Sequence, residues 1–198
     1  VDRLENSINC TAQNSLDLQS FGLGNFELHN NSSKIFALDQ IKSFCKSQPN
    51  QLKDKVIESV EAQCRYIPNK NTSDYYTKIS WPELKKISDE PLFTIGGHSL
   101  YHDILTSYSG DDSRLIMDIE ISIKLLEFNL KTPIHHYSYP EGQAIHFNEK
   151  IISILKSFGI ICCPSGIFGI NSLDDELFKL KRIMVGFNKT EFPFSGYE

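Results

Sequence analysis

The chain of 198 residues is long enough to bury a hydrophobic core and most simply forms one domain. With 40% hydrophobic and 23% charged residues, its composition is that of an ordinary soluble globular protein. A net charge of −5 with scattered basic residues gives no reason to expect nucleic acid as a partner, and no apolar run is long enough to cross a bilayer.

The amino-terminal part predicts two short amphipathic helices after a polar, irregular start. The first 34 residues are polar and are interrupted by Gly22, Gly24 and the cluster HNNSS. The segments SKIFALDQIKSFCKS and QLKDKVIESVEAQC then each place apolar residues on one helical face, and Pro49 separates them. Residues 66–79 are expected to form a loop.

From residue 80 onward, predicted helices and strands alternate. SWPELKKISD starts a helix with Ser80 as N-cap, LFTIGG is a short buried strand, and residues 111–128 form the longest helix. The strand IHHYSY, the helix FNEKIISILKSFG and the strands IICCP and FKLKRIMVGF follow. This alternation predicts an α/β fold with parallel strands, whose ligands bind at the carboxyl ends of the strands.

Two histidines follow the first of these strands, in the stretch FTIGGHSLYHDIL. His98 and His102 are four residues apart, so their neutral imidazoles can present two nitrogens to one divalent metal ion. Gly96 and Gly97 are expected to let the backbone turn sharply and bring both rings over the edge of the sheet. The alternative is a pair of unrelated histidines, because this spacing often arises by chance.

The next strand ends in HHYSYPEG, which is a second candidate region. His135 and His136 point to opposite faces of a strand, so at most one of them can address the same site as His98. Tyr137 and Tyr139 are equally well explained as residues of the core.

Acidic residues and known nucleophile motifs add little to this picture. The pairs at residues 111–112 and 174–175 are read as structural or solvated, and Asp103 is a candidate supporting partner of His102. The sequence contains no G-x-S-x-G elbow, Walker loop or G-x-G-x-x-G. Five cysteines without metal-ligand spacing favour free thiols and a reducing compartment, so the cytoplasm is preferred over the periplasm.

Two ordered motifs resemble those of a known family. LFTIGGHSLYHDIL resembles the H-[ST]-x-x-H motif of the polysaccharide deacetylases (carbohydrate esterase family four), and HHYSYPEG is similar to that family's R-x-x-x-x-P-x-G motif. The helical segment between the motifs and ISWPELKKISD before them also resemble the family. The resemblance extends over residues 80–185, and the helices nearer the amino terminus look like an insertion found in envelope-polysaccharide members.

The resemblance implies a distorted (β/α) barrel that binds one divalent ion, often zinc, through an Asp-His-His set. His98 and His102 would be the two histidine ligands. Ser99, whose hydroxyl would brace the loop, is a candidate substrate-binding residue. The backbone N–H of Glu141 would face the oxyanion during metal-assisted hydrolysis of an N-acetyl group. The turn that would line the sugar groove consists of Tyr139, Pro140, Glu141 and Gly142.

The chain also departs from the family pattern. The family's T-F-D-D motif, which supplies the metal aspartate and the base, has no counterpart, and no histidine follows His146. His135 stands where the family has the arginine that holds the base, and Glu141 stands where an aromatic is usual; these two are the candidate catalytic residues. We therefore expect an incomplete barrel whose amino-terminal strands are missing, in one domain over residues 1–198, with insertion and loops at 1–79 and a βα core at 80–190.

Two functions remain open at this stage. The first is a metal-dependent deacetylase of an envelope or surface polysaccharide, weakly active or inactive without the missing motif. The second is a catalytically degenerate domain that binds a glycan or a protein. A phosphoesterase is disfavoured because the chain offers few carboxylate ligands at strand ends.

Overall fold

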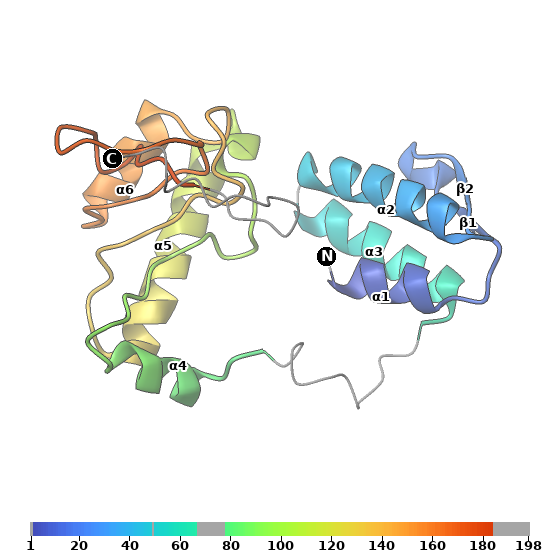
Figure 1. The fold of residues 1–198 in the computed structure, drawn as a ribbon, viewed down its shortest axis with the longest axis horizontal. Coiled ribbons are helices and arrows are strands. Elements are labelled where there is room, and N and C mark those ends of the chain that lie inside the picture. The colour runs from blue at the N-terminus through green and yellow to red at the C-terminus, as the bar shows by residue number, and fades with distance from the viewer. Residues whose placement is uncertain (1, 49, 67–77, 184–198) are drawn as a thin grey trace, which may run out of the picture. The chain divides into compact units, whose positions relative to one another are not determined.

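The computed structural model describes residues 2–48, 50–66 and 78–183. The chain divides into two units, Val1–Ser80 and Trp81–Glu198 (Figure 1). The sequence-based assignment of residues 1–198 to a single domain stays a prediction.

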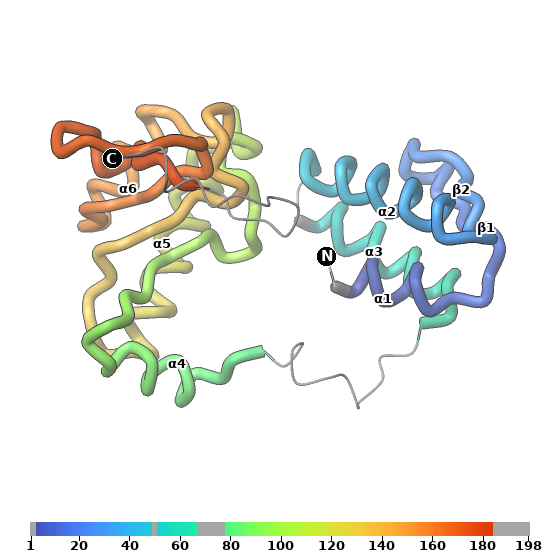
Figure 2. The backbone as a smooth tube through the Cα atoms, in the orientation of Figure 1, coloured from blue at the N-terminus to red at the C-terminus, as the bar shows by residue number. Residues whose placement is uncertain are grey.

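In its described residues the first unit contains three α-helices and one hairpin. The helices are α1 (Asp2–Cys10), α2 (Asn31–Lys46) and α3 (Asn50–Cys64); the hairpin pairs β1 (Ser15–Asp17) antiparallel with β2 (Asn25–Glu27) around the short helix η1 (Gln19–Phe21). The three helices contact one another, as Figure 2 traces. The two amphipathic helices expected from the sequence are therefore confirmed as α2 and α3.

Local side-chain contacts explain where these elements begin and how they are held. The Asn30 side chain accepts the Ser33 N–H at 2.8 Å and the Ser33 hydroxyl accepts the Asn30 N–H at 3.2 Å, which forms the capping box of α2. Arg3 of α1 makes two hydrogen bonds to the Glu61 carboxylate of α3, at 2.7 and 2.6 Å. The hairpin buries Leu16 and Phe26, one residue from each short strand. The sequence predicted neither α1 nor the hairpin.

The second unit contains the helices that the sequence predicts. They are α4 (Trp81–Ser88), α5 (Asp112–Leu130) and α6 (Glu149–Ser157); the structure adds the short helix η3 (Leu105–Tyr108), which the sequence did not predict. Asp111 caps α5 by accepting the Arg114 N–H at 3.1 Å, and Asn148 caps α6 by accepting the Ile151 N–H at 3.0 Å. None of the helices in the described ranges is long and apolar enough to cross a membrane.

Three of the predicted strands lie parallel but are joined only by isolated bridges. Gly97 bridges to Tyr137, and His136 bridges to Cys162. The Gly97 N–H donates to the His136 carbonyl at 3.0 Å, and the Tyr137 N–H donates to the Cys162 carbonyl at 3.0 Å. This parallel order fits an α/β fold. Among the described residues the only extended sheet is the two-stranded hairpin of the first unit, so a barrel is not shown.

The last predicted strand, FKLKRIMVGF, is represented by one parallel bridge between Phe168 and Arg182. Residues 184–187 of that segment lie outside the described residues. In addition, the Cys163 N–H donates to the Leu177 carbonyl at 2.9 Å and the Ser165 N–H to the Leu180 carbonyl at 2.8 Å. Residues 177–182 therefore lie beside the segment that contains Cys163.

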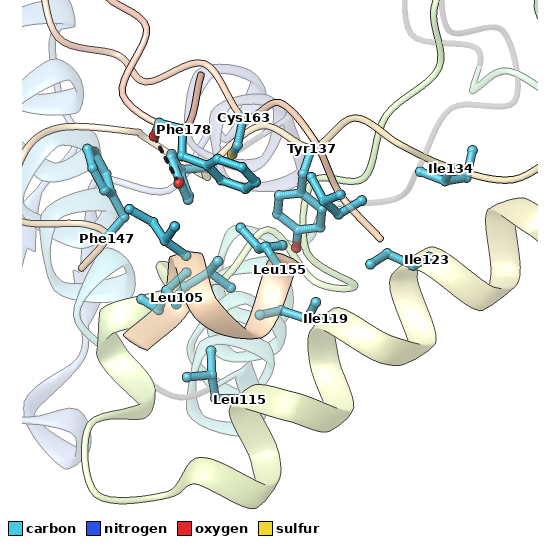
Figure 3. Packing of buried hydrophobic residues seen from close by; sticks show 14 of the residues in the cluster. Leu105, Leu115, Ile119, Ile123, Ile134, Tyr137, Phe147, Leu155, Cys163 and Phe178 are labelled. Carbon is cyan, nitrogen blue, oxygen red and sulfur yellow. Dashed lines mark hydrogen bonds between the residues drawn. The ribbon is translucent and has the colours of Figure 1, made fainter. Parts of the chain in front are cut away.

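One apolar core connects the parallel segments to α5 and α6 (Figure 3). The Tyr139 ring stacks on Phe147 with centroids 4.4 Å apart, and its hydroxyl donates to the Phe178 carbonyl at 3.0 Å. Residues of this cluster that are labelled in Figure 3 include Leu115, Ile119, Ile123, Tyr137, Leu155 and Cys163. Because this core fixes the segments at residues 97 and 137–139, it also fixes where the loops after them begin.

Candidate active site

The structure brings the two predicted histidines together. The ring centroids of His98 and His102 are 4.7 Å apart, and the ring planes meet at 74° in an edge-to-face arrangement. Both residues are exposed and follow Gly97, whose bridge to Tyr137 marks the carboxyl end of the first parallel segment. This is the end of a parallel α/β arrangement at which ligands bind.

A backbone carbonyl fixes the tautomer of the His98 ring. Its Nδ1 lies 2.7 Å from the carbonyl oxygen of Ser138, at the end of the neighbouring segment. Because a carbonyl oxygen can only accept, Nδ1 carries the proton, and in the neutral ring Nε2 then presents a lone pair. Histidines that bind metal ions are held in this way, with the second ring nitrogen donating to a carbonyl or carboxylate.

The backbone turns at different residues from those expected. Ser99 and His102 adopt left-handed conformations with φ of 63° and 58°, whereas neither Gly96 nor Gly97 has a positive φ. The prediction that the glycines make the turn was therefore wrong, and they are needed for close approach instead. A Cβ on Gly97 would lie 2.5 Å from Cδ2 of Tyr137, and one on Gly96 would lie 2.9 Å from the His136 carbonyl oxygen.

Hydrogen bonds from two other elements hold the loop between the histidines. The Ser99 N–H donates to the Tyr137 hydroxyl at 2.6 Å, and the Leu100 N–H lies 3.3 Å from both carboxyl oxygens of Asp118 on α5. The Ser99 hydroxyl donates to Asp118 at 3.2 Å and accepts the Asp103 N–H at 3.1 Å. Ser99 thus braces the loop from inside, while its predicted role in substrate binding stays a prediction.

Asp118 was missed by the sequence analysis, although the sequence carries a signal for it. The helix α5 buries Leu115, Ile119, Ser122 and Ile123 along one face, and Asp118 lies on that same face with 4% of its surface exposed. A charged residue on the apolar face of an amphipathic helix requires a partner, because an unpaired buried carboxyl group is costly. Burial raises the pKa of Asp118, and the hydrogen bonds from Leu100 and Ser99 oppose this shift.

The exit of the loop is fixed by a buried phenol. The Tyr108 hydroxyl, on η3, donates to Asp103 Oδ2 at 2.8 Å and also lies 3.3 Å from Asp118 Oδ2. Burial and the two neighbouring carboxyl groups raise the pKa of Tyr108, so the phenol stays protonated. Asp103 was considered as a supporting partner of His102; the structure buries it and bonds it to Tyr108.

The residues of HHYSYPEG divide between the core and the surface. Tyr137 and Tyr139 are both 1% exposed and belong to the core, and the predicted role of Tyr139 in substrate binding stays a prediction. His135 is exposed, and its Nδ1 lies 3.1 Å from the Gly159 carbonyl. Since Ser138, the residue that contacts His98, lies three positions further along an extended segment, His135 stands about 10 Å from that contact. The predicted catalytic role of His135 stays a prediction.

The turn after Tyr139 has a geometry that requires glycine. Gly142 has a φ of 67°, and a Cβ there would lie 2.6 Å from the Gly166 nitrogen. The Gly142 N–H donates to the Pro140 carbonyl at 2.7 Å, and the Gly166 N–H donates to the Gly142 carbonyl at 2.7 Å. Glu141 is exposed and also left-handed, with a φ of 60°. The turn is therefore rigidly built, and the predicted roles of Pro140, Glu141 and Gly142 in the sugar groove stay predictions.

The donor set of this site fits part of a zinc centre. Two imidazoles are common zinc ligands, but a stable protein site requires at least three donors. Within residues 2–48, 50–66 and 78–183, no group of three His, Cys, Asp or Glu side chains could hold a metal ion. His98 and His102 can thus provide two ligands, and Asp118 is occupied with the loop backbone.

The fold and the site define an α/β protein with a histidine pair at the carboxyl end of a parallel segment. Residues 57–162 match the polysaccharide deacetylase family, which is more than half of the chain. The chain belongs to this family, as its two motifs indicated. No curated protein shows significant similarity to it.

Two solved structures that are named as deacetylases show limited similarity to this chain. The Streptococcus pyogenes deacetylase PplD in complex with acetate is 17% identical with a TM-score of 0.48; the match covers 57% of this chain and 47% of PplD. The deacetylase domain of BpsB from Bordetella bronchiseptica is 16% identical with a TM-score of 0.49, and the match covers 64% of each chain. The chain therefore corresponds to about half of PplD and under two thirds of the BpsB domain.

Proposed function

We propose that this chain acts as a metal-dependent hydrolase that removes N-acetyl groups from an envelope or surface polysaccharide. The observation that carries the proposal is the adjacent pair His98 and His102. The Ser138 carbonyl orients His98 so that the lone pair of Nε2 is available to bind a metal ion. Membership of the polysaccharide deacetylase family supports the substrate class. The proposed fold around the pair is the distorted (β/α) barrel of that family, of which the three parallel segments would form a part.

The chemistry divides between the ion and the chain. A bound divalent ion, which we take to be zinc because imidazole suits it, would supply Lewis-acid polarisation of the amide carbonyl and activate water. The chain would hold the ion through His98 and His102, and a further carboxylate would be required to complete the ligand set. The rigid turn at residues 139–142 would support the sugar, with the Glu141 N–H facing the developing oxyanion.

The proposal is tested by zinc binding together with acetate release. Isothermal titration of the full chain with zinc, and acetate release from a polymer of N-acetylglucosamine, are measured for the wild type and for His98→Ala and His102→Ala. We expect both variants to lose zinc binding and any zinc-dependent acetate release while keeping the helical circular dichroism signal. His29→Ala is the matched control, because His29 is an exposed histidine of the first unit that pairs with Glu27. Zinc binding unchanged by either substitution would contradict the proposal.

A second function, glycan binding without hydrolysis, is favoured by the donor count. Two histidines with no third ligand among the described residues would bind zinc weakly. The two functions are separated by adding saturating zinc to the glycan complex. Acetate release under that condition supports the hydrolase, and stable glycan binding without acetate supports the binding domain.

A further inference from the structure

The loop that carries the two histidines is held in a conformation that its own sequence does not favour. Ser99 and His102 are non-glycine residues with left-handed φ values of 63° and 58°. Such residues persist only where the surrounding structure fixes them. What fixes this loop therefore also fixes the relative positions of the His98 and His102 rings.

The hydrogen bonds of the loop lead to one buried group. The Asp118 carboxyl accepts the Leu100 N–H and the Ser99 hydroxyl. The same hydroxyl oxygen accepts the N–H groups of Tyr101 at 3.3 Å and Asp103 at 3.1 Å. Asp118 thus accepts one backbone N–H of the loop directly. It also orients the Ser99 hydroxyl, which accepts two further backbone N–H groups of the loop.

The surroundings of Asp118 show no other use for a carboxyl group. It is 4% exposed on the apolar face of α5, and among the described residues no lysine or arginine forms an ion pair with it. Its remaining polar contact is the Tyr108 hydroxyl, at 3.3 Å. A buried acid without a cationic partner is stabilised by the hydrogen bonds that it accepts, and here those bonds come from the histidine loop and from η3.

We propose that Asp118 is the positioning residue of the histidine pair: it holds residues 99–103 so that His98 and His102 lie side by side for one cation. Asp118 does not contact the ion or the substrate. It acts from α5, a helix packed into the core, so that the position of an exposed loop is determined by a rigid element. The relevance of this positioning to hydrolysis rests on the proposed function, whereas the effect on the rings does not.

The test compares Asp118→Leu and Asp118→Asn in the full chain. Leucine is similar in size but accepts no hydrogen bond, so it leaves the Leu100 N–H and the Ser99 hydroxyl without their acceptor. Asparagine keeps one carbonyl oxygen that can accept the Leu100 N–H, so its histidine spectra and zinc affinity should be closer to those of the wild type. If the leucine variant does not fold, Asp118→Asn alone provides the test. The first readout is ¹⁵N NMR of the histidine side chains, in which wild-type His98 should show a protonated Nδ1.

The matched control is Glu127→Leu. Glu127 lies on the same helix, and its carboxylate accepts the backbone N–H of Ile134 at 3.1 Å. Glu127→Leu also removes a carboxylate that accepts a backbone N–H, that of Ile134, but it does so at the end of α5 away from the histidines. We expect Glu127→Leu to lower the melting temperature without changing the His98 and His102 spectra or zinc binding.

The expected result is a changed tautomer signal for His98 in Asp118→Leu, with zinc affinity about 10- to 100-fold weaker, as when groups that orient metal ligands are removed. Asp118→Asn should lie between this variant and the wild type. Unchanged histidine spectra and zinc affinity in both variants would overturn the proposal, whatever the melting temperature does. If the wild type binds no zinc, the proposed function fails, and the histidine spectra alone test the role of Asp118. Changed His98 and His102 spectra in the Asp118 variants would then support positioning by Asp118, and unchanged spectra would refute it.

Discussion

Replacing Gly97 with alanine should destabilise the second unit through one identifiable contact. The added Cβ would lie 2.5 Å from Cδ2 and 2.6 Å from Cε2 of Tyr137, so the buried ring would have to withdraw by about 1 Å to reach ordinary contact. Overpacking of this kind costs about 1–3 kcal/mol. Loss of glycine entropy in the unfolded chain offsets about 0.4–1 kcal/mol, which leaves a net loss of about 1–2 kcal/mol. Withdrawal of the ring would also weaken the hydrogen bond from the Ser99 N–H to the Tyr137 hydroxyl.

The assay is urea denaturation followed by tryptophan fluorescence. Trp81, at the start of α4, is the single tryptophan of the chain, so its signal reports on the second unit. A double-mutant cycle with Tyr137→Ala isolates the contact, because Gly97→Ala should cost close to nothing once the ring is absent. If Gly97→Ala lowers the free energy of unfolding equally in the wild type and in Tyr137→Ala, the reasoning is refuted. It is also refuted if the substitution has no effect on the wild type.

Three further predictions concern a carboxyl group, a thiol and an amide. Because burial raises the pKa of Asp118, the folded state binds that proton more tightly than the unfolded chain; this contribution to stability is complete at low pH and is lost as the pH rises through the raised pKa. As the pH rises above about 4, the ordinary pKa of an aspartate, the wild type should therefore lose more stability than Asp118→Asn, as read from urea midpoints, and parallel pH profiles would exclude this. Burial raises the pKa of Cys163 to about 12, so iodoacetamide should alkylate exposed Cys10 and spare Cys163 until urea is added, which peptide mass spectrometry can check. Gln63 accepts the Asp17 N–H at 2.9 Å and donates to its carbonyl at 2.7 Å, so Gln63→Ala should cost the first unit about 1 kcal/mol in thermal unfolding followed by circular dichroism; an unchanged midpoint would show that water replaces both bonds.

The helices and the histidine pair could be predicted from the sequence because their determinants are local. Apolar spacing defines α2, α3, α5 and α6 to within a few residues at each end. The parallel order of the segments at residues 97, 137 and 162 follows from their alternation with helices. Local signals were too weak for α1 and for the hairpin, whose strands have three residues each and depend on burial of Leu16 and Phe26 in the first unit.

The support of the loop could not be predicted in the same way, since it depends on contacts between distant residues. Asp118 is 18 positions from Leu100, and Tyr137 is 38 positions from Ser99. The sequence placed the turn at the two glycines because glycine is the usual residue for positive φ. The structure instead uses glycine for close packing against Tyr137, and it uses side-chain hydrogen bonds to hold Ser99 in the left-handed conformation.

The same geometry explains why the loop should respond as a unit to changes in its supports. Tyr137 fixes the first amide of the loop, Asp118 fixes the second, and Tyr108 fixes Asp103 near its end. All three supporting side chains are buried, while the histidines that they hold in place are exposed. Because Tyr137 and Asp118 both bind Ser99, and Tyr108 also contacts Asp118, removal of any one weakens the geometry on which the others depend. Their effects on the histidine pair should therefore be smaller in combination than the sum of the single changes, as is usual for residues in one hydrogen-bond network.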